Sequence, residues 1–188
     1  MRQRQLPFLG LLLVVSLVAV LSQMGLPARE PYQPTETDRI AVIDTFLRSR
    51  GEGAVVQRRM QPVREDSVEH KAAEKLSRGR RIPKLFEQLS ASSKVPDGLK
   101  AARRIVSADD LAAIENSPRG FWHAFHKNHP GQSYLVELSP LAFNADGTDC
   151  YFVASCYQDG LTGEVGIAHL HRGSAGWVVQ AFEVFLVS

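Results

Sequence analysis

The spacing of apolar residues predicts a helix over residues 36–50. Its apolar positions share one helical face: Ile40, Ile43, Phe46 and Leu47. Thr35 is a typical N-cap, and Asp38 places an acid in the first turn. Further, shorter helices are predicted through Val68–Leu76, from Pro83 to Leu89, after the Ser107 cap, and from Ser117 to the residue before Pro130.

After Pro130 the pattern changes to one that is typical of strands. Strands are predicted at residues 133–143, 149–157, 164–172 and 177–187. The short, glycine-bearing turns between them predict a four-stranded antiparallel meander, and residues 54–63 suit one additional strand. We therefore expect an α+β fold, with N-terminal helices packed on one face of the meander, as a single domain over residues 36–188.

The first 28 residues differ from the rest because they form an export segment. Arg2 and Arg4 precede a nearly continuous apolar run, Leu6–Leu21, and small residues follow it. This order is typical of a signal peptide, whereas a slightly longer run serves as a retained signal anchor. Both fates place the domain outside the cytoplasm, in the periplasm, extracellular, or anchored to the membrane. Residues 29–35 are a proline-bearing linker.

Charge is balanced in the mature chain but unevenly distributed. The net charge of +2 comes from Arg2 and Arg4, so the chain after the export segment gives no electrostatic reason to expect nucleic acid as a partner. Residues 58–104 hold 13 Lys or Arg against 6 Asp or Glu, whereas residues 105–188 hold 3 against 9. The basic region is either a solvated surface or a contact with an anionic membrane.

The two cysteines do not suit a disulfide, although export implies an oxidising compartment. Cys150 and Cys156 lie in one predicted strand, which separates them by about 20 Å, whereas a disulfide needs Cα atoms within about 7 Å. We expect both to act as small apolar residues. Tyr151 and Tyr157 share a face of the same strand, where they suit either a ligand or ordinary packing.

Aromatic, glycine and turn residues of the C-terminal half form a recognisable series. It runs Phe121-Trp-x-x-Phe125-x-x-x-His-Pro130, Leu138-Ser139-x-x-x-Phe143-Asn144, Gly160-Leu-x-Gly163 and Gly176-Trp177. The series is similar to an uncharacterised family of small exported proteins with an aromatic helix, an L-S-x-x-x-F-N strand, a Gly-x-x-Gly turn and a C-terminal G-x-W hairpin. The resemblance implies a fold and a compartment, but no activity. His129 stands where the family usually has an aromatic residue, and Thr162 where a cysteine often precedes the glycine.

Histidines are the residues that suggest chemistry. His123 and His126 are spaced i, i+3 on a helix, and His169 and His171 are spaced i, i+2 on a strand. If the two pairs met, they would form a zinc or copper site; otherwise they are surface histidines. No catalytic constellation is evident. The favoured function is therefore a non-enzymatic binding or envelope-associated role without a cofactor, with an unknown protein or small ligand as partner. The alternative is a metal-binding or metal-dependent hydrolytic protein.

Overall fold

The computed structural model describes residue 30 and residues 32–51, 53–78, 82, 84–132, 134–158 and 162–187. The chain divides into two units, residues 1–30 and residues 31–188, and every described helix and strand belongs to the second. The predicted export segment, residues 1–28, lies outside the described residues. Among the helices that are described, none is long and apolar enough to cross a membrane.

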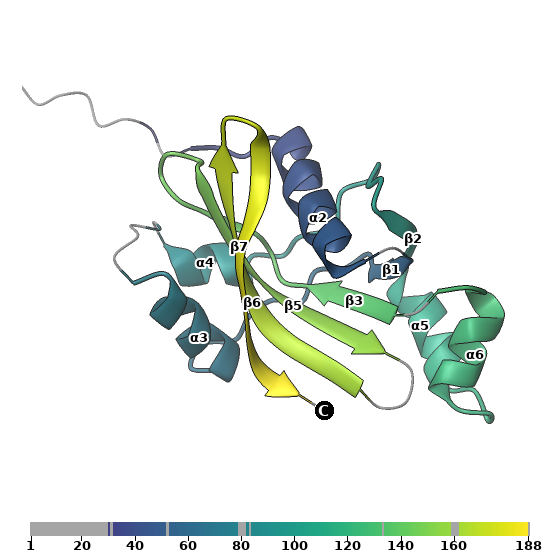
Figure 1. The fold of residues 1–188 in the computed structure, drawn as a ribbon. Coiled ribbons are helices and arrows are strands. Elements are labelled where there is room, and N and C mark those ends of the chain that lie inside the picture. The colour runs from purple at the N-terminus through teal and green to yellow at the C-terminus, as the bar shows by residue number, and fades with distance from the viewer. Residues whose placement is uncertain are drawn as a thin grey trace, which may run out of the picture. The chain divides into compact units, whose positions relative to one another are not determined.

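Within the described residues, seven strands form one sheet of order β2-β1-β3-β5-β6-β7, with β4 paired to β5 (Figure 1). The strands are β1 (Ala54–Gln57), β2 (Ala102–Val106), β3 (Tyr134–Leu138), β4 (Ala142–Phe143), β5 (Asp149–Gln158), β6 (Thr162–Gly173) and β7 (Gly176–Val187). β1 runs parallel to both β2 and β3, and the other pairs are antiparallel. The fold is therefore α+β with a mostly antiparallel sheet.

The sheet is larger than the predicted four-stranded meander, which corresponds to β3, β5, β6 and β7. β1 is shorter than predicted and lies inside the sheet, between β2 and β3. The sequence did not suggest β2, because the exposed side chains of Arg103 and Arg104 interrupt its apolar pattern. The strand predicted over 133–143 divides into β3 and β4 at Ser139 and Pro140, since proline has no N–H to donate to a neighbouring strand.

Helices cover both faces of the sheet rather than the single face that we expected. They are α2 (Glu36–Arg50), α3 (Val68–Leu76), α4 (Leu85–Ser90), α5 (Ala108–Glu115) and α6 (Phe121–Asn128). Successive residues of a strand point to opposite faces. Phe152 of β5 therefore packs in the cluster that contains α2, whereas Val153 packs in the cluster that contains α3 and α4. Both clusters are needed because the middle of the sheet is apolar on both sides.

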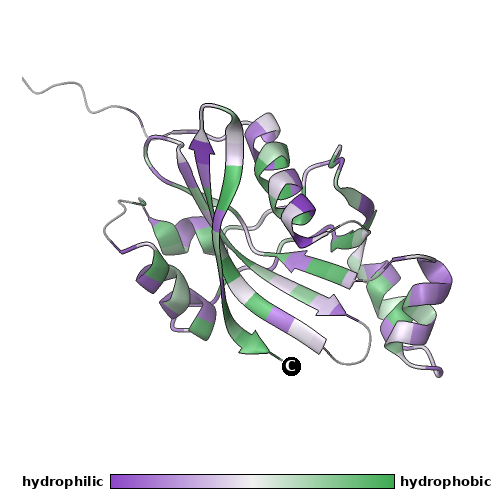
Figure 2. Cartoon of the chain, viewed as in Figure 1, coloured by the Kyte–Doolittle hydropathy of each residue, from purple (hydrophilic) through white to green (hydrophobic). Residues whose placement is uncertain are grey.

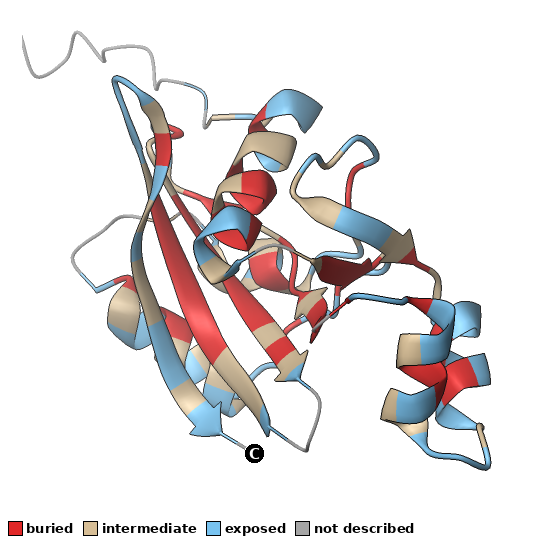
Figure 3. Cartoon of the chain, turned by 45° about the vertical axis from the view of Figure 1, so that its right-hand side comes forward, coloured by how far each residue is buried: buried red, intermediate tan, exposed pale blue. Residues whose placement is uncertain are grey.

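The α2 face holds the largest core cluster. Phe46 of α2 meets Phe152 edge to face, with ring centroids 5.1 Å apart. Cys150 and Cys156 belong to the same cluster as free, buried thiols. Figure 3 shows the middle of β5 and β6 buried, whereas most of β7, at the edge of the sheet, is half-buried or exposed.

The opposite face carries two separate clusters. α3 and α4 pack over Val153 and Ile167, and α5 and α6 pack over Val55 and Leu135. Figure 2 shows apolar and polar positions alternating along α3, as an amphipathic helix requires. Its apolar face is not the predicted one throughout, because Val68 is 62% exposed.

The helix predicted over residues 36–50 is confirmed together with its N-cap. The Asp38 N–H donates to Thr35 Oγ1 at 3.2 Å, and the Thr35 N–H donates to Asp38 Oδ2 at 3.0 Å. This reciprocal capping box satisfies backbone groups that would otherwise lack partners at the start of the helix. Ser107 and Asp110 form the same arrangement at the start of α5. Local capping signals were therefore reliable in this chain.

Candidate functional site

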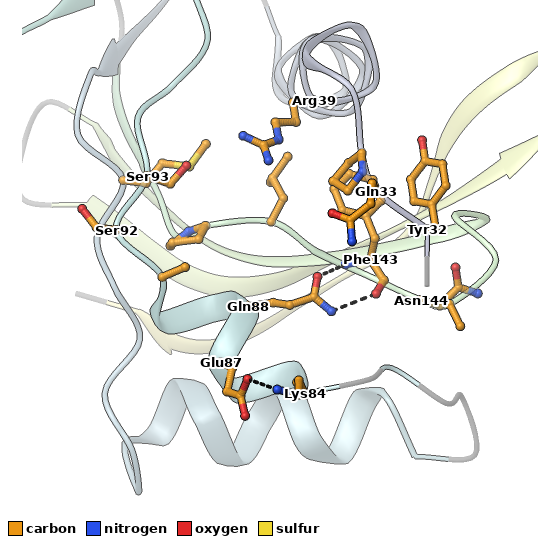
Figure 4. A pocket seen from close by; sticks show the side chains of 16 residues that line it. Tyr32, Gln33, Arg39, Lys84, Glu87, Gln88, Ser92, Ser93, Phe143 and Asn144 are labelled. Atoms are coloured by element: carbon orange, nitrogen blue, oxygen red, sulfur yellow. Dashed lines mark hydrogen bonds and ion pairs between the residues drawn. The ribbon is translucent and has the colours of Figure 1, made fainter. Parts of the chain in front are cut away.

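A pocket of about 510 Å³ lies beside the N-terminal end of α2, and we call it the α2 pocket (Figure 4). Three stretches of chain line it: residues 32–39, residues 84–93 including α4, and residues 140–145 including β4. Met60 completes the lining. Its volume falls in the range of about 300–1,000 Å³ that small-molecule sites occupy.

The floor of the α2 pocket is apolar. Met60 and Phe143 line it, and each side chain is only 2% exposed. Phe143 is held from behind by Trp177, with ring centroids 5.9 Å apart. Leu141 adds a partly buried surface beside them. The floor therefore offers contact to an apolar group without requiring the core to rearrange.

Gln88 of α4 fixes one side of the pocket. Its side-chain amide donates to the Phe143 carbonyl at 3.0 Å, and its amide oxygen accepts from the Phe143 N–H at 2.9 Å. These two bonds imitate the pairing of a neighbouring strand, so α4 is tied to β4 in a defined register. The position of the Lys84 and Glu87 side chains on the rim follows from this attachment.

Tyr32 fixes the opposite side of the pocket. Its N–H donates to the Ala145 carbonyl at 3.1 Å, and its ring lies 5.8 Å from the ring of Phe143. Gly147 makes room for this ring, because a Cβ atom at that position would lie 2.5 Å from Tyr32 Cγ. The chain is thus anchored to the domain only a few residues after the predicted export segment.

Asp38 and Arg39 are neighbours with different roles. Burial works to raise the pKa of Asp38, but hydrogen bonds from Thr35 and Tyr32 and the nearby Arg172 outweigh it and lower that pKa. Arg172 Nη2 lies 3.1 Å from Asp38 Oδ1. The Asp38 carboxylate therefore caps the helix and pairs with Arg172, and it does not neutralise the charge of Arg39.

Arg39 is the unbalanced charge of the α2 pocket. Among the residues that the structure describes, no acidic side chain forms an ion pair with it, and Figure 4 shows its side chain reaching from α2 into the pocket. On the opposite rim, Lys84 Nζ lies 2.9 Å from Glu87 Oε2, so these two charges offset each other. The lining therefore carries one net positive charge.

The α2 pocket combines an apolar floor, one guanidinium group and two serine hydroxyls, those of Ser92 and Ser93. A guanidinium group presents paired N–H donors that match the oxygens of a carboxylate or phosphate. The Ser93 hydroxyl, which lies on the Arg39 side of its segment in Figure 4, can donate a further hydrogen bond to such a group. This arrangement suits a ligand with an apolar body and an anionic group.

The two predicted histidine pairs lie in different parts of the fold. His123 and His126 belong to α6, whereas His169 and His171 belong to β6 close to its hairpin with β7 (Figure 1). Among the described residues, no group of three or more His, Cys, Asp or Glu is placed to hold a metal ion. The four histidines are thus not brought together, and zinc or copper binding stays a prediction.

The strand pair of histidines shares a carboxylate instead. His169 Nε2 lies 2.8 Å and His171 Nδ1 lies 3.2 Å from the same Asp149 oxygen. Burial works to raise the pKa of Asp149, but its contacts with the two histidines lower that pKa. The buried His169 ring also stacks on Tyr151, with centroids 4.5 Å apart. This cluster joins the ends of β5 and β6.

The cysteines show no sign of reactivity. Burial raises the pKa of the Cys150 thiol well above its usual value and also raises the pKa of Cys156. A thiol reacts as its thiolate, so a raised pKa makes both groups poor nucleophiles.

Sequence reasoning missed the residues that define the α2 pocket, namely Arg39, Met60 and Gln88. The motif Leu138-Ser139-x-x-x-Phe143-Asn144 contains one of its walls, but as a sequence pattern it predicts only a strand and a turn.

Comparison of the chain with models of protein families, with curated proteins and with solved structures found no match. The resemblance to small exported proteins therefore stays a prediction that rests on its motif residues. Function must be argued from the geometry of the chain's own residues.

Proposed function

We propose that this chain is an exported, non-enzymatic binding protein whose α2 pocket holds an amphiphilic ligand with one anionic group. The observation that carries the proposal is Arg39, whose guanidinium has no acidic partner among the described residues and reaches into the pocket that Met60 and Phe143 also line. A buried apolar floor favours the ligand's chain, and the guanidinium selects its anionic end.

The compartment in this proposal comes from the first 28 residues. They have the pattern of a signal peptide or signal anchor, which places the domain in the periplasm, outside the cell, or tethered at the outer side of a membrane. The resemblance to small exported proteins agrees with this location. Tyr32, four residues beyond that segment in the sequence, lines the α2 pocket.

The basic region supports a membrane source for the ligand. Lys84, Ser92 and Ser93 of the pocket belong to residues 58–104, which carry the excess of Lys and Arg. Such a region is attracted to anionic headgroups, and this attraction weakens with salt. In this proposal the region brings the domain to an anionic surface, and the α2 pocket receives a single-chain lipid from it.

Calorimetric titration with dodecyl phosphate, below its micelle concentration, tests the proposal. Arg39→Gln should weaken binding about tenfold or more, because a hydrogen-bonded charge is lost. Arg48→Gln is the matched control, since Arg48 lies on the same helix with its side chain 61% exposed and outside the pocket. Equal binding of dodecyltrimethylammonium, or unchanged affinity in Arg39→Gln, would contradict the proposal.

The metal-binding or hydrolytic alternative has one supporting observation, the Asp149 carboxylate held between His169 and His171. A carboxylate hydrogen-bonded to histidines is a common way to orient metal ligands. Zinc or copper should then raise the melting temperature, and His171→Ala should abolish the shift. A melting temperature that does not respond to either metal would remove this candidate.

A further inference from the structure

A second hollow, of about 850 Å³, lies on the sheet face opposite α2, and we call it the acidic groove. It exists because the two helix pairs on that face pack over different strands. α3 and α4 cover Val153 and Ile167, and α5 and α6 cover Val55 and Leu135. Part of β3 and β5 between these clusters remains uncovered, and its side chains line the groove.

Polar side chains replace apolar ones where the helices are missing. Glu137 of β3 and Ser155 of β5 are direct partners across the sheet, and both line the groove. The Tyr157 hydroxyl, on the same face, donates to Glu137 Oε2 at 3.4 Å. Gln57 of β1 follows in the same row, since the preceding residue Val56 pairs with Val136. Its amide oxygen is buried and has no hydrogen-bond partner among the described residues, although Gln57 does not itself line the groove.

Glu137 is an unusual residue for this position. Among the described residues no basic side chain forms an ion pair with it, and its hydrogen-bond partner is the Tyr157 hydroxyl. Burial raises the pKa of Glu137, and the nearby charge of Glu115 on α5 adds to the increase. A half-buried carboxylate without a counter-ion is costly, and such residues concentrate at functional sites.

The rim of the acidic groove is also mostly acidic. Residues 61–69 contribute Glu65, Asp66 and Glu69, against one base, Arg64. Together with Glu137, four acidic residues and one basic residue line the groove. Its apolar surface comes from Val153, Val165 and Leu186. Leu186 is 57% exposed at the edge of the sheet, so this surface is accessible.

We infer that the acidic groove binds an organic cation, a primary ammonium with an apolar chain. The ammonium pairs with the Glu137 carboxylate and donates to the Ser155 and Tyr157 hydroxyl oxygens, and the chain lies along Val165 and Leu186. The cation supplies the ion-pair partner that Glu137 does not have among the described residues. The lining of this site shares no residue with that of the α2 pocket and has the opposite net charge.

Octylamine at neutral pH is a suitable probe, with octanol and octanoate as controls of equal chain length. We expect calorimetry to detect octylamine binding, with octanol and octanoate at least about tenfold weaker. Glu137→Gln should weaken octylamine binding about tenfold, whereas Glu183→Gln, an exposed acid of β7 outside the groove, should not. Arg39→Gln should also leave octylamine binding unchanged, which separates this result from the α2 pocket.

A second variant tests the same site in case Glu137→Gln does not fold. Ser155→Leu keeps the carboxylate but fills the groove beside it, so it should also weaken octylamine binding, and circular dichroism should show both variants folded. Absence of octylamine binding to the unmodified chain overturns the inference. So does equal binding of octanol, or full octylamine affinity in folded Glu137→Gln and Ser155→Leu.

Discussion

The α2 pocket and the acidic groove are lined by consecutive residues of the same two segments. Met60 and Pro140 line the pocket, whereas their neighbours Gln61 and Ser139 line the groove. In extended chain, adjacent side chains point to opposite sides. Two short segments therefore separate a hollow with one net positive charge from a hollow in which acids outnumber bases.

This difference shows why whole-chain charge is a poor guide to ligands in this protein. Beyond the predicted export segment the acidic and basic residues balance, so composition gives no electrostatic reason to expect nucleic acid and suggests no other ligand. The structure separates the charges locally, with Arg39 on one side and Glu137 on the other. The two ligand classes that we propose therefore follow from local charge, which the average over the chain conceals.

Replacing Ser139 should disturb both hollows, and we expect this change to have the largest effect on stability. The Val153 N–H donates to Ser139 Oγ at 2.8 Å, and the Ser139 hydroxyl donates to the Pro140 carbonyl at 2.9 Å. Ser139→Ala leaves a buried N–H without a partner, which lowers the free energy of unfolding by about 1–3 kcal/mol. Urea denaturation measures this change.

Ser92→Ala is the control for that measurement, because Ser92 is exposed on the rim of the α2 pocket. Its effect on the free energy of unfolding should stay within about 0.5 kcal/mol. Ser139→Ala should also weaken the binding of dodecyl phosphate and of octylamine. If only one ligand is affected, the two hollows do not depend on a common wall.

Local signals allowed much of the fold to be predicted. The Thr35 cap, the apolar face of residues 36–50 and the glycine-bearing turns after Pro130 each act within a few residues, so α2 and the β5–β7 hairpins followed from them. The inner position of β1 did not, because its parallel partners, β2 and β3, lie far along the sequence. Such pairing depends on the whole sheet rather than on four residues.

The candidate sites were less predictable than the fold, for the same reason. The α2 pocket assembles Arg39, Gln88 and Phe143 from three distant segments, and their meeting leaves no local pattern. From the sequence alone, Glu137 is an ordinary polar residue of a strand. Its place in a groove depends on where the surrounding helices pack. The strand face that carries Tyr151 and Tyr157 did draw attention, and Tyr157 contacts Glu137, but Tyr151 is fully buried.

Gly147→Ala should damage the α2 pocket alone. Gly147 has φ +69°, and an added Cβ would lie 2.5 Å from the Tyr32 ring. The backbone strain costs about 1–2 kcal/mol, and the ring must also move. Dodecyl phosphate binding should weaken, and protease cleavage near Tyr32 should become faster, because the Tyr32 contacts to Phe143 and Ala145 are lost.

Gly176→Ala is the matched control, because it introduces backbone strain without the steric clash that Gly147→Ala makes with Tyr32. Gly176 also has a positive φ, +111°, but nothing lies within 4 Å of an added Cβ. It should lose at least as much stability to backbone strain, because φ +111° lies outside the left-handed helical region, while keeping dodecyl phosphate affinity and the original cleavage rate. Equal loss of ligand in both variants would show that Tyr32 does not maintain the pocket. Octylamine binding should be unaffected in either case.

The smallest expected effect concerns the acidic groove and appears only as a function of pH. Because the pKa of Glu137 is raised in the folded chain, the folded state holds this proton more tightly than the unfolded state. The unmodified chain should therefore lose stability relative to Glu137→Gln as pH rises from the usual glutamate pKa through the raised value, and the difference should then level off. Urea denaturation of both chains at a series of pH values measures the difference.

Comparing two chains that differ only at Glu137 cancels the other acids. Asp38 and Asp149 have lowered pKa values, so they contribute stability that is lost as pH falls, the opposite direction. Octylamine sharpens the test, because a cation beside the carboxylate stabilises its ionised form and should reduce the stability difference at neutral pH. A difference that is constant with pH, or that octylamine does not alter, would mean that another charge within the folded chain already balances the Glu137 carboxylate.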